Sequence, residues 1–152
     1  MRKKNKGFSM VEIIIVIAIM AILAAAMAPM LIKYVGKARK SRDVDTGKEI
    51  YAACIRAAVE MGEEDITSQL GSSGSVLVRY DTVLNNPPQN VIDYAFDEFG
   101  GIPRSASHKD YYWEIEYDVT NKSIERINLT AGAGSSDKFE VYPNSEVFLE
   151  GN

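Results

Sequence analysis

The longest apolar stretch of the chain lies close to its amino end. From Ile13 to Ile32, twenty consecutive side chains carry neither a charge nor a hydrogen-bonding group. Twenty residues rise about 30 Å as an α-helix, which matches the hydrocarbon core of a bilayer. The stretch therefore predicts a helix long enough to cross a membrane.

Beyond this stretch the pattern becomes amphipathic. Apolar residues recur at spacings of three and four, the period of a helix with one buried side, and Gly62 is suited to end that helix. A continuous helix from Phe8 to Met61 would extend about 80 Å. Cys54 lies on the apolar side, so we expect a buried core residue rather than a reactive thiol. The apolar side comprises Val44, Gly47, Ile50, Tyr51, Cys54, Ala58 and Met61, and the polar side comprises Arg42, Asp43, Asp45, Lys48, Glu49, Arg56 and Glu60.

The carboxyl-terminal part predicts short strands and one short helix. Residues 90–100 favour a helix with Asn90 as its cap and Gly100 as its stop. Residues 111–119 alternate between apolar and polar, which indicates a strand with one face on the amphipathic helix and the other in water. Further strands are expected at 75–80, 124–129, 139–142 and 146–149, with those after residue 110 forming an antiparallel meander. The predicted fold class is α+β: a long amino-terminal helix whose hydrophobic half protrudes, packed on a small antiparallel sheet.

Charge is distributed unevenly along the chain. Residues 1–42 hold nine of the 17 Lys and Arg residues but only one of the 21 acidic residues, Glu12. Beyond residue 42, 8 basic residues stand against 20 acidic ones, so a basic stalk is followed by an acidic head. An acidic head argues against a large nucleic-acid footprint, and the sequence offers no basic patch for DNA. Nucleic acid is therefore not indicated as a partner.

Residues suited to catalysis or to metal binding are sparse. The sole histidine, His108, lies in a polar loop and is expected to be solvated rather than to act as a base. One Cys and one His do not make a usual zinc site, and no phosphate-binding glycine motif occurs. The acidic run at 63–65 is typical of solvated surface. We therefore expect a protein that is not an enzyme and that has no cofactor.

One carboxylate stands at the start of the apolar stretch. Four basic residues precede Gly7 and Phe8, and Glu12 follows immediately before the run. A secretory signal peptide has no reason to carry this charge, and Pro29 directly after Ala28 disfavours cleavage among the small residues there. An uncleaved membrane anchor is the better plain alternative, although basic residues on both flanks leave its orientation open. Neither alternative explains Glu12 together with the Gly-Phe pair.

The run Lys6-Gly7-Phe8-Ser9-Met10-Val11-Glu12, followed by the apolar stretch, resembles the class III signal of type IV prepilins and of the pseudopilins of type II secretion and competence systems. The resemblance covers residues 1 to about 62 and implies the pilin fold. It also implies that a prepilin peptidase cuts after Gly7 and methylates the new amine of Phe8. Ser9-Met10 stands where many members have Thr-Leu, which changes no charge. The implied divisions are a leader at 1–7, a transmembrane and filament-core helix at 8–32, an amphipathic half-helix at 33–62 and a globular head at 63–152.

The resemblance further implies roles in assembly for Phe8, Glu12 and Pro29. In the family the corresponding glutamate pairs with the amino terminus of a neighbouring subunit, so Glu12 is expected to pair with the ammonium of another copy's Phe8. Opposite charges attract strongly where the dielectric is low, and each alone is costly to bury. Pro29 matches a family proline at which the helix is expected to kink, and in filaments to melt over the stretch before it.

The function implied by the resemblance is that of a structural subunit of a type IV pilus. Such a subunit is inserted in the cytoplasmic membrane and then polymerised on the cell surface for adhesion, twitching motility or DNA uptake. Two alternatives stay open: a pseudopilin of a secretion or competence system, and an uncleaved membrane-anchored binding module. The implied partners are copies of itself, the prepilin peptidase, an assembly ATPase, a polytopic platform protein and, before assembly, membrane lipid.

Two weaker expectations concern source and metal. The chain has a single cysteine, so the disulfide loop of many Gram-negative pilins is absent, which weakly favours a Gram-positive bacterium. Major pseudopilins are known for a calcium site in the carboxyl-terminal loop. Asp137 and Glu140 match only part of such a site, so no cofactor is expected.

Overall fold

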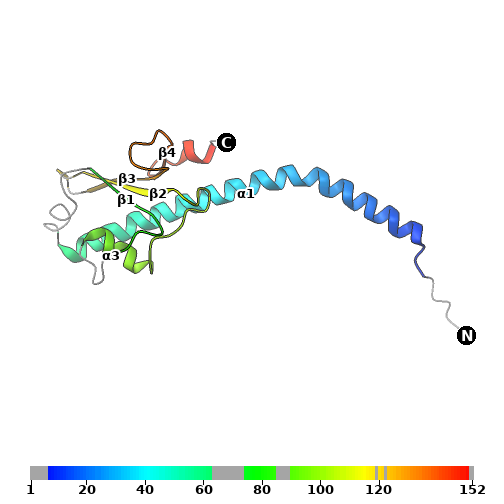
Figure 1. The fold of residues 1–152 in the computed structure, drawn as a ribbon, viewed down its shortest axis with the longest axis horizontal. Helices are drawn as coiled ribbons and strands as arrows, with labels where there is room; N and C mark the ends of the chain where they lie inside the picture. The colour runs from blue at the N-terminus through cyan, green and yellow to red at the C-terminus, as the bar shows by residue number, and fades with distance from the viewer. Residues whose placement is uncertain (1–6, 63–73, 85–89, 119, 122, 151–152) are drawn as a thin grey trace, which may run out of the picture. The chain divides into compact units, whose positions relative to one another are not determined.

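The computed structural model describes residues 7–62, 74–84, 90–118, 120–121 and 123–150. It confirms the α+β class, with a long amino-terminal helix and a four-stranded antiparallel sheet (Figure 1). Contacts within the chain divide it into two compact units, Met1–Lys37 and Ala38–Asn152. The elements are α1 (Met10–Met61), β1 (Ser75–Val78), α3 (Val91–Glu98), β2 (Tyr112–Asp118), β3 (Ser123–Thr130), β4 (Lys138–Tyr142) and α4 (Glu146–Glu150).

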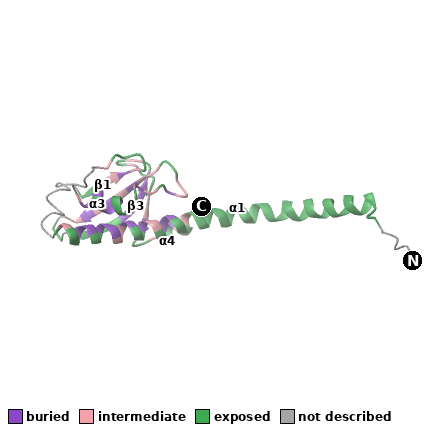
Figure 2. Cartoon of the chain, turned by 90° about the horizontal axis from the view of Figure 1, so that it is seen from below, coloured by how far each residue is buried: buried purple, intermediate pink, exposed green. Residues whose placement is uncertain are grey.

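Helix α1 changes character along its length. Every residue from Met10 to Arg39 is exposed, whereas the buried residues of α1 all lie beyond position 42. Figure 2 shows the same change, with buried residues only on the carboxyl-terminal part of α1. Gly62 follows the last helical residue with φ of 82°, a left-handed conformation that glycine adopts without strain. The predicted end of the helix is therefore confirmed.

The sheet has the strand order β1-β2-β3-β4, and every neighbouring pair is antiparallel. On β2 the residues Trp113, Ile115 and Tyr117 are buried and alternate with partly exposed ones, as the sequence pattern predicted. The indole Nε1 of Trp113 donates a hydrogen bond of 2.7 Å to the carbonyl of Pro103, so this buried ring keeps a polar partner. The strand begins at Tyr112, one residue later than predicted, and runs to Asp118; Val119 of the predicted range lies outside the described residues.

The sheet approaches α1 closely at one glycine. A Cβ placed on Gly47 would lie 2.9 Å from Cγ2 of Val141 on β4, closer than real carbon contacts allow. Four residues further along α1, the ring of Tyr51 packs on Tyr142 with centroids 4.5 Å apart. Gly47 thus belongs to the apolar side of the helix because its missing side chain lets β4 sit against α1.

The short helix α3 forms where the sequence predicted it. The side-chain oxygen of Asn90 accepts a 2.9 Å hydrogen bond from the backbone N–H of Asp93, which caps the first turn. Gly100 follows the helix with φ of 70°. The apolar side of α3 is buried, with Phe96 fully enclosed, so the helix is held by packing as well as by its cap.

Two predicted strands differ from the structure. Residues 146–149 form the helix α4 rather than a strand: Val147 is 83% exposed while Phe148 is 2% exposed, so the pattern of a strand with alternate faces is not followed. Phe148 joins the core from a single turn of helix instead. The strand predicted at 75–80 ends at Val78, and the acidic run 63–65 lies outside the described residues.

Candidate functional site

The amino end of α1 begins with a side-chain cap. The backbone N–H of Ser9 donates a 2.8 Å hydrogen bond to Oε2 of Glu12, and Oγ of Ser9 accepts a 3.4 Å bond from the N–H of Val11. This arrangement is a variant of the capping box, in which a glutamate three residues after a serine accepts the serine N–H while the serine hydroxyl accepts the N–H of the second helical residue. Glu12 therefore has a local structural role in the uncleaved chain, and the Ser-x-x-Glu spacing could have revealed it.

Phe8 and Glu12 also line a shallow hollow. Its volume is about 310 Å³, and its remaining walls are the apolar side chains of Ile13, Ile15 and Val16. Phe8 itself is 85% exposed. The structure therefore places the carboxylate of Glu12 beside the residue at which the predicted cut would create an amine, within an otherwise apolar surface.

The first half of α1 has the composition and exposure of a membrane segment. Among the described residues, α1 is the helix that is long and apolar enough to cross a bilayer, with a mean hydropathy of 2.8 over its most apolar window and none of that window buried. Its apolar side chains from Met10 to Val35 face outward. An exposed apolar surface of this extent is typical of a segment that contacts a membrane or another protein.

Pro29 lies inside α1, which continues as α-helix on both sides of it. A proline in a helix removes one backbone hydrogen bond and crowds the carbonyl four residues earlier. The expected kink, and the expected melting before Pro29 in filaments, stay predictions because the free subunit does not test them.

The head contains a polar cluster that the sequence did not predict, centred on Asp43 of α1. The pattern placed Asp43 on the polar side of the helix, which is wrong: Asp43 is 1% exposed. Its Oδ1 accepts the N–H of Ala106 at 2.6 Å. Its Oδ2 accepts the N–H of Ser107 at 2.9 Å and Oγ of Ser105 at 3.0 Å, and it also accepts the hydroxyl of Ser107. Four neutral donors from one loop thus surround a buried carboxylate and fix the loop to α1.

His108 continues this cluster and is partly buried in its loop rather than fully solvated as predicted. Its Nδ1 lies 2.8 Å from Oγ of Ser107, and its backbone N–H donates to Oγ of Ser105 at 3.0 Å. The ring lies 4.5 Å from that of Tyr111 and 5.4 Å from that of Phe139, measured between centroids. The imidazole is therefore part of an aromatic layer joining the loop to β4, and its position indicates a structural role.

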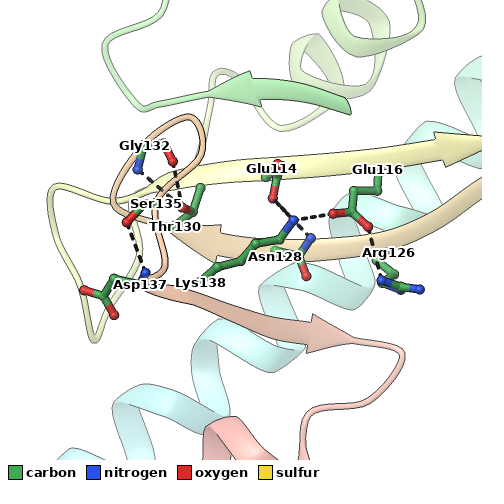
Figure 3. Close-up of polar contacts among 9 residues, drawn as sticks. All are labelled: Glu114, Glu116, Arg126, Asn128, Thr130, Gly132, Ser135, Asp137 and Lys138. Atoms are coloured by element: carbon green, nitrogen blue, oxygen red, sulfur yellow. Dashed lines mark hydrogen bonds and ion pairs between the residues drawn. The ribbon is translucent and has the colours of Figure 1, made fainter. Parts of the chain in front are cut away.

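Charged side chains form a ladder on the face of the sheet opposite α1 (Figure 3). The ammonium of Lys138 on β4 forms ion pairs with Glu114 and Glu116 of β2, and Glu116 also meets Arg126 of β3 at 3.5 Å. Burial lowers the pKa of Lys138, but the bonds to both glutamates outweigh this and raise the pKa overall. Opposite charges on adjacent strands stabilise this face of the sheet. The charged residues are therefore accounted for by a structural role.

Asp137 and Glu140, the two residues that match part of a pseudopilin calcium site, each have a hydrogen-bond donor as partner. The hydroxyl of Tyr111 donates to Asp137, and the backbone N–H of Asn144 donates to Glu140 at 3.0 Å. No group of three or more His, Cys, Asp or Glu side chains suited to a metal ion occurs in the described part of the chain. A role for Asp137 and Glu140 in calcium binding remains a hypothesis from the sequence alone.

Comparisons with known proteins give two findings. Residues 2–28 match the family model described as the prokaryotic N-terminal methylation motif. The type IV major fimbrial protein FimA of Dichelobacter nodosus is 31% identical to the chain over 106 residues, which cover 64% of this chain and 66% of that protein. The match thus spans slightly less than two thirds of the relative's length. No solved structure matches the chain.

Proposed function

We propose that this chain, a type IV pilin-like subunit as the methylation motif and the fimbrial relative support, is polymerised into a type IV pilus. The observation that carries the proposal is the exposed apolar half of α1, preceded by Gly7, Phe8 and Glu12. In the membrane, lipid covers this surface. In a filament, helices of other copies replace the lipid and form an apolar core.

Processing creates the charge that Glu12 then meets. Cleavage after Gly7 leaves an ammonium on Phe8, and methylation of that amine keeps it charged. An isolated carboxylate is costly to place in an apolar environment. On insertion scales the free-energy cost of such a charge is about 2.5–3.5 kcal/mol at mid-membrane and less near the ends of the helix. An amine from a neighbouring copy removes much of that cost, so the pair favours assembly over the free subunit.

The capping box competes with this pairing. In the uncleaved chain Glu12 already accepts the N–H of Ser9, which is a neutral donor. A charged amine is a stronger partner than a backbone amide, because it adds the attraction between two full opposite charges, which is large where the dielectric is low. Glu12 therefore has two successive partners under the proposal: its own helix end before assembly and a neighbouring amine afterwards.

The remaining machinery and location follow from the proposed family role. The subunit is held in the cytoplasmic membrane by α1, processed by a prepilin peptidase, and moved into the filament by an assembly ATPase and a platform protein. The assembled filament lies on the cell surface, where it serves adhesion, motility or DNA uptake. A structural subunit needs no catalytic group. A Gram-positive source receives no support from the comparisons.

The proposal is tested by substitutions at Gly7 and Glu12. Gly7→Ala should block processing, because under the proposal the peptidase requires glycine immediately before the bond that it cuts. Glu12→Ala should allow processing but reduce the filaments recovered by shearing. Glu12→Gln is the decisive comparison, since a glutamine still accepts the N–H of Ser9 and preserves the cap but carries no charge.

Four outcomes separate the possible roles of Glu12 and of the chain. If Glu12→Gln fails to assemble as Glu12→Ala does, charge pairing is supported. Normal filaments from both variants would contradict the pairing. Processed wild-type subunits that stay in the membrane without surface filaments would instead favour a pseudopilin, and an uncut wild-type leader would favour the membrane-anchored binding module.

A further inference from the structure

The proposed processing leaves a mature subunit with a strongly negative net charge. The predicted leader removes Arg2, Lys3, Lys4 and Lys6, whereas residues 43–152 keep 20 acidic residues against 8 basic ones. Copies of such a head repel one another when a filament brings them together. The compensating charge lies in the segment 33–42, called here the basic segment, which holds five basic residues and no acidic one.

A groove between α1 and α3 offers a complementary surface. Two adjoining hollows of about 400 and 170 Å³ lie on either side of Arg56 and Glu98. Tyr94 and Phe99 of the α3 region supply apolar wall. We call this the α1/α3 groove, and its charged lining residues are Glu49, Arg56, Glu60, Asp97 and Glu98.

The centre of the groove is already neutralised. Arg56 donates through Nε to both oxygens of Glu98 at 3.1 Å and through Nη2 to Oε2 at 3.0 Å. This bidentate pair fixes the two side chains across the groove. Glu49, Glu60 and Asp97 remain around it, and within the described residues their carboxylates form no ion pair or hydrogen bond. The groove therefore carries three uncompensated negative charges.

We propose that the α1/α3 groove binds the basic segment of a neighbouring copy, an inference that rests on the proposed filament. Lys33, Lys37, Arg39 and Arg42 are exposed, and in the described part of the chain their side chains have no acidic partner. The lysine and arginine stems cover apolar wall while their heads meet the free carboxylates. The opposite signs of the two surfaces favour a second copy of this chain as the occupant.

Beyond Glu49, which lies seven residues or about 10 Å after Arg42 on α1, the contact is made between copies and not within one chain. Arg39 and Arg56 lie 17 residues apart on the same helix, a rise of about 25 Å. No lysine or arginine side chain spans that distance. Two copies joined by this contact are therefore displaced along α1 by about 25 Å. The Glu12 contact joins a different pair of neighbouring copies. Bringing Phe8 of one copy to Glu12 of the other requires a shift of only about four residues along the helix.

Charge reversal on both surfaces tests the contact in the full-length protein in its native cell. Glu60→Lys with Asp97→Lys should reduce sheared filaments by roughly tenfold, and so should Lys37→Glu with Arg39→Glu, because each brings like charges together. All four substitutions combined should restore filaments to within about twofold of wild type. The matched control is Asp110→Lys with Glu125→Lys, which makes the same charge change at exposed head positions outside the groove.

The results separate this inference from the proposed function. Loss in each reversed pair with recovery in the combined variant supports the contact. Equal assembly of the groove variant and the control overturns it, and so does loss without recovery in the combined variant while processed subunit persists in the membrane. Absence of filaments from the wild-type chain would overturn the proposed function itself.

Disulfide formation gives a second readout that does not depend on filament yield. Arg39→Cys with Glu60→Cys places two thiols about 32 Å apart along one helix, too far for a bond within a chain. Mild oxidation of filaments should give a ladder of covalent multimers. The variant Arg39→Cys with Glu125→Cys should give none. Equal ladders from both, or none from either, would contradict the proposed contact.

Discussion

The buried carboxylate of Asp43 gives the sharpest prediction for the stability of the head. Replacing it by alanine removes the acceptor for two backbone amides and two serine hydroxyls. The hydroxyls can rotate to other acceptors, but the N–H groups of Ala106 and Ser107 are fixed. Each buried donor left without a partner costs about 1–3 kcal/mol. Relief from burying a charge offsets part of this, so we expect a loss of about 3 kcal/mol for Asp43→Ala.

Asp43→Asn tests the same reasoning without a change of shape. One oxygen of the carboxylate serves Ala106 and the other serves both serines, so an amide nitrogen at either position faces a donor. We expect a loss of about 2 kcal/mol, because at least one donor is left unpaired. The control is Asp45→Ala two residues away, whose exposed pair with Lys48 at 3.4 Å should contribute less than about 0.5 kcal/mol.

The assay is thermal unfolding of the full-length protein in detergent, followed by the near-ultraviolet signal of Trp113. For a domain of this size about 3 kcal/mol corresponds to a fall of roughly 10–20 °C in Tm. The control should move Tm by a few degrees at most. An Asp43→Asn protein with the Tm of wild type would refute the view that these oxygens hold the loop.

Three further predictions concern other parts of the head. Trp113→Ala should destabilise by about 3–5 kcal/mol, and Trp113→Phe by about 1–3 kcal/mol as the bond to Pro103 is lost; an unchanged Tm in either would place the ring outside the core. Burial raises the pKa of the Cys54 thiol to about 12 from 9.0, so alkylation at pH 8 should be roughly a thousandfold slower in the folded than in the unfolded protein, and equal rates would contradict its burial. Hydrogen bonds from the N–H groups of Thr120 and Asn121 hold the pKa of the Asp118 carboxyl below its ordinary value. These bonds therefore stabilise the folded protein above the pKa that Asp118 has when unfolded, and this stabilisation is lost as the pH falls through the folded pKa. Asp118→Asn should therefore flatten the fall in Tm between neutral and acid pH, and an identical acid profile would exclude this source.

The elements with strong periodic patterns were predictable from the sequence. The helix through Met61, the capped helix after Asn90 and the strand around Trp113 each have a long pattern or a specific cap, and all three were confirmed. Residues 146–149 are too few to distinguish a strand from a single helical turn. Their helix is set by packing, since it is Phe148 that enters the core.

The polar cluster of the head was not predictable by the same means. Helical periodicity assigns Asp43 to the side of its charged neighbours, and only a loop more than 60 residues away supplies the donors that make its burial favourable. His108 likewise packs against Phe139 of β4, a residue about 30 positions further along the chain. By contrast, the cap formed by Ser9 and Glu12 is local and was readable from the spacing of the two residues.

The measurement that tests the central claim most directly is mass spectrometry of the filaments sheared from the native cell surface. The account predicts abundant subunits that begin at Phe8 and carry one methyl group on its amine. Subunits in the filament that retain residues 1–7 would contradict it, because the amine that Glu12 is proposed to meet would not exist.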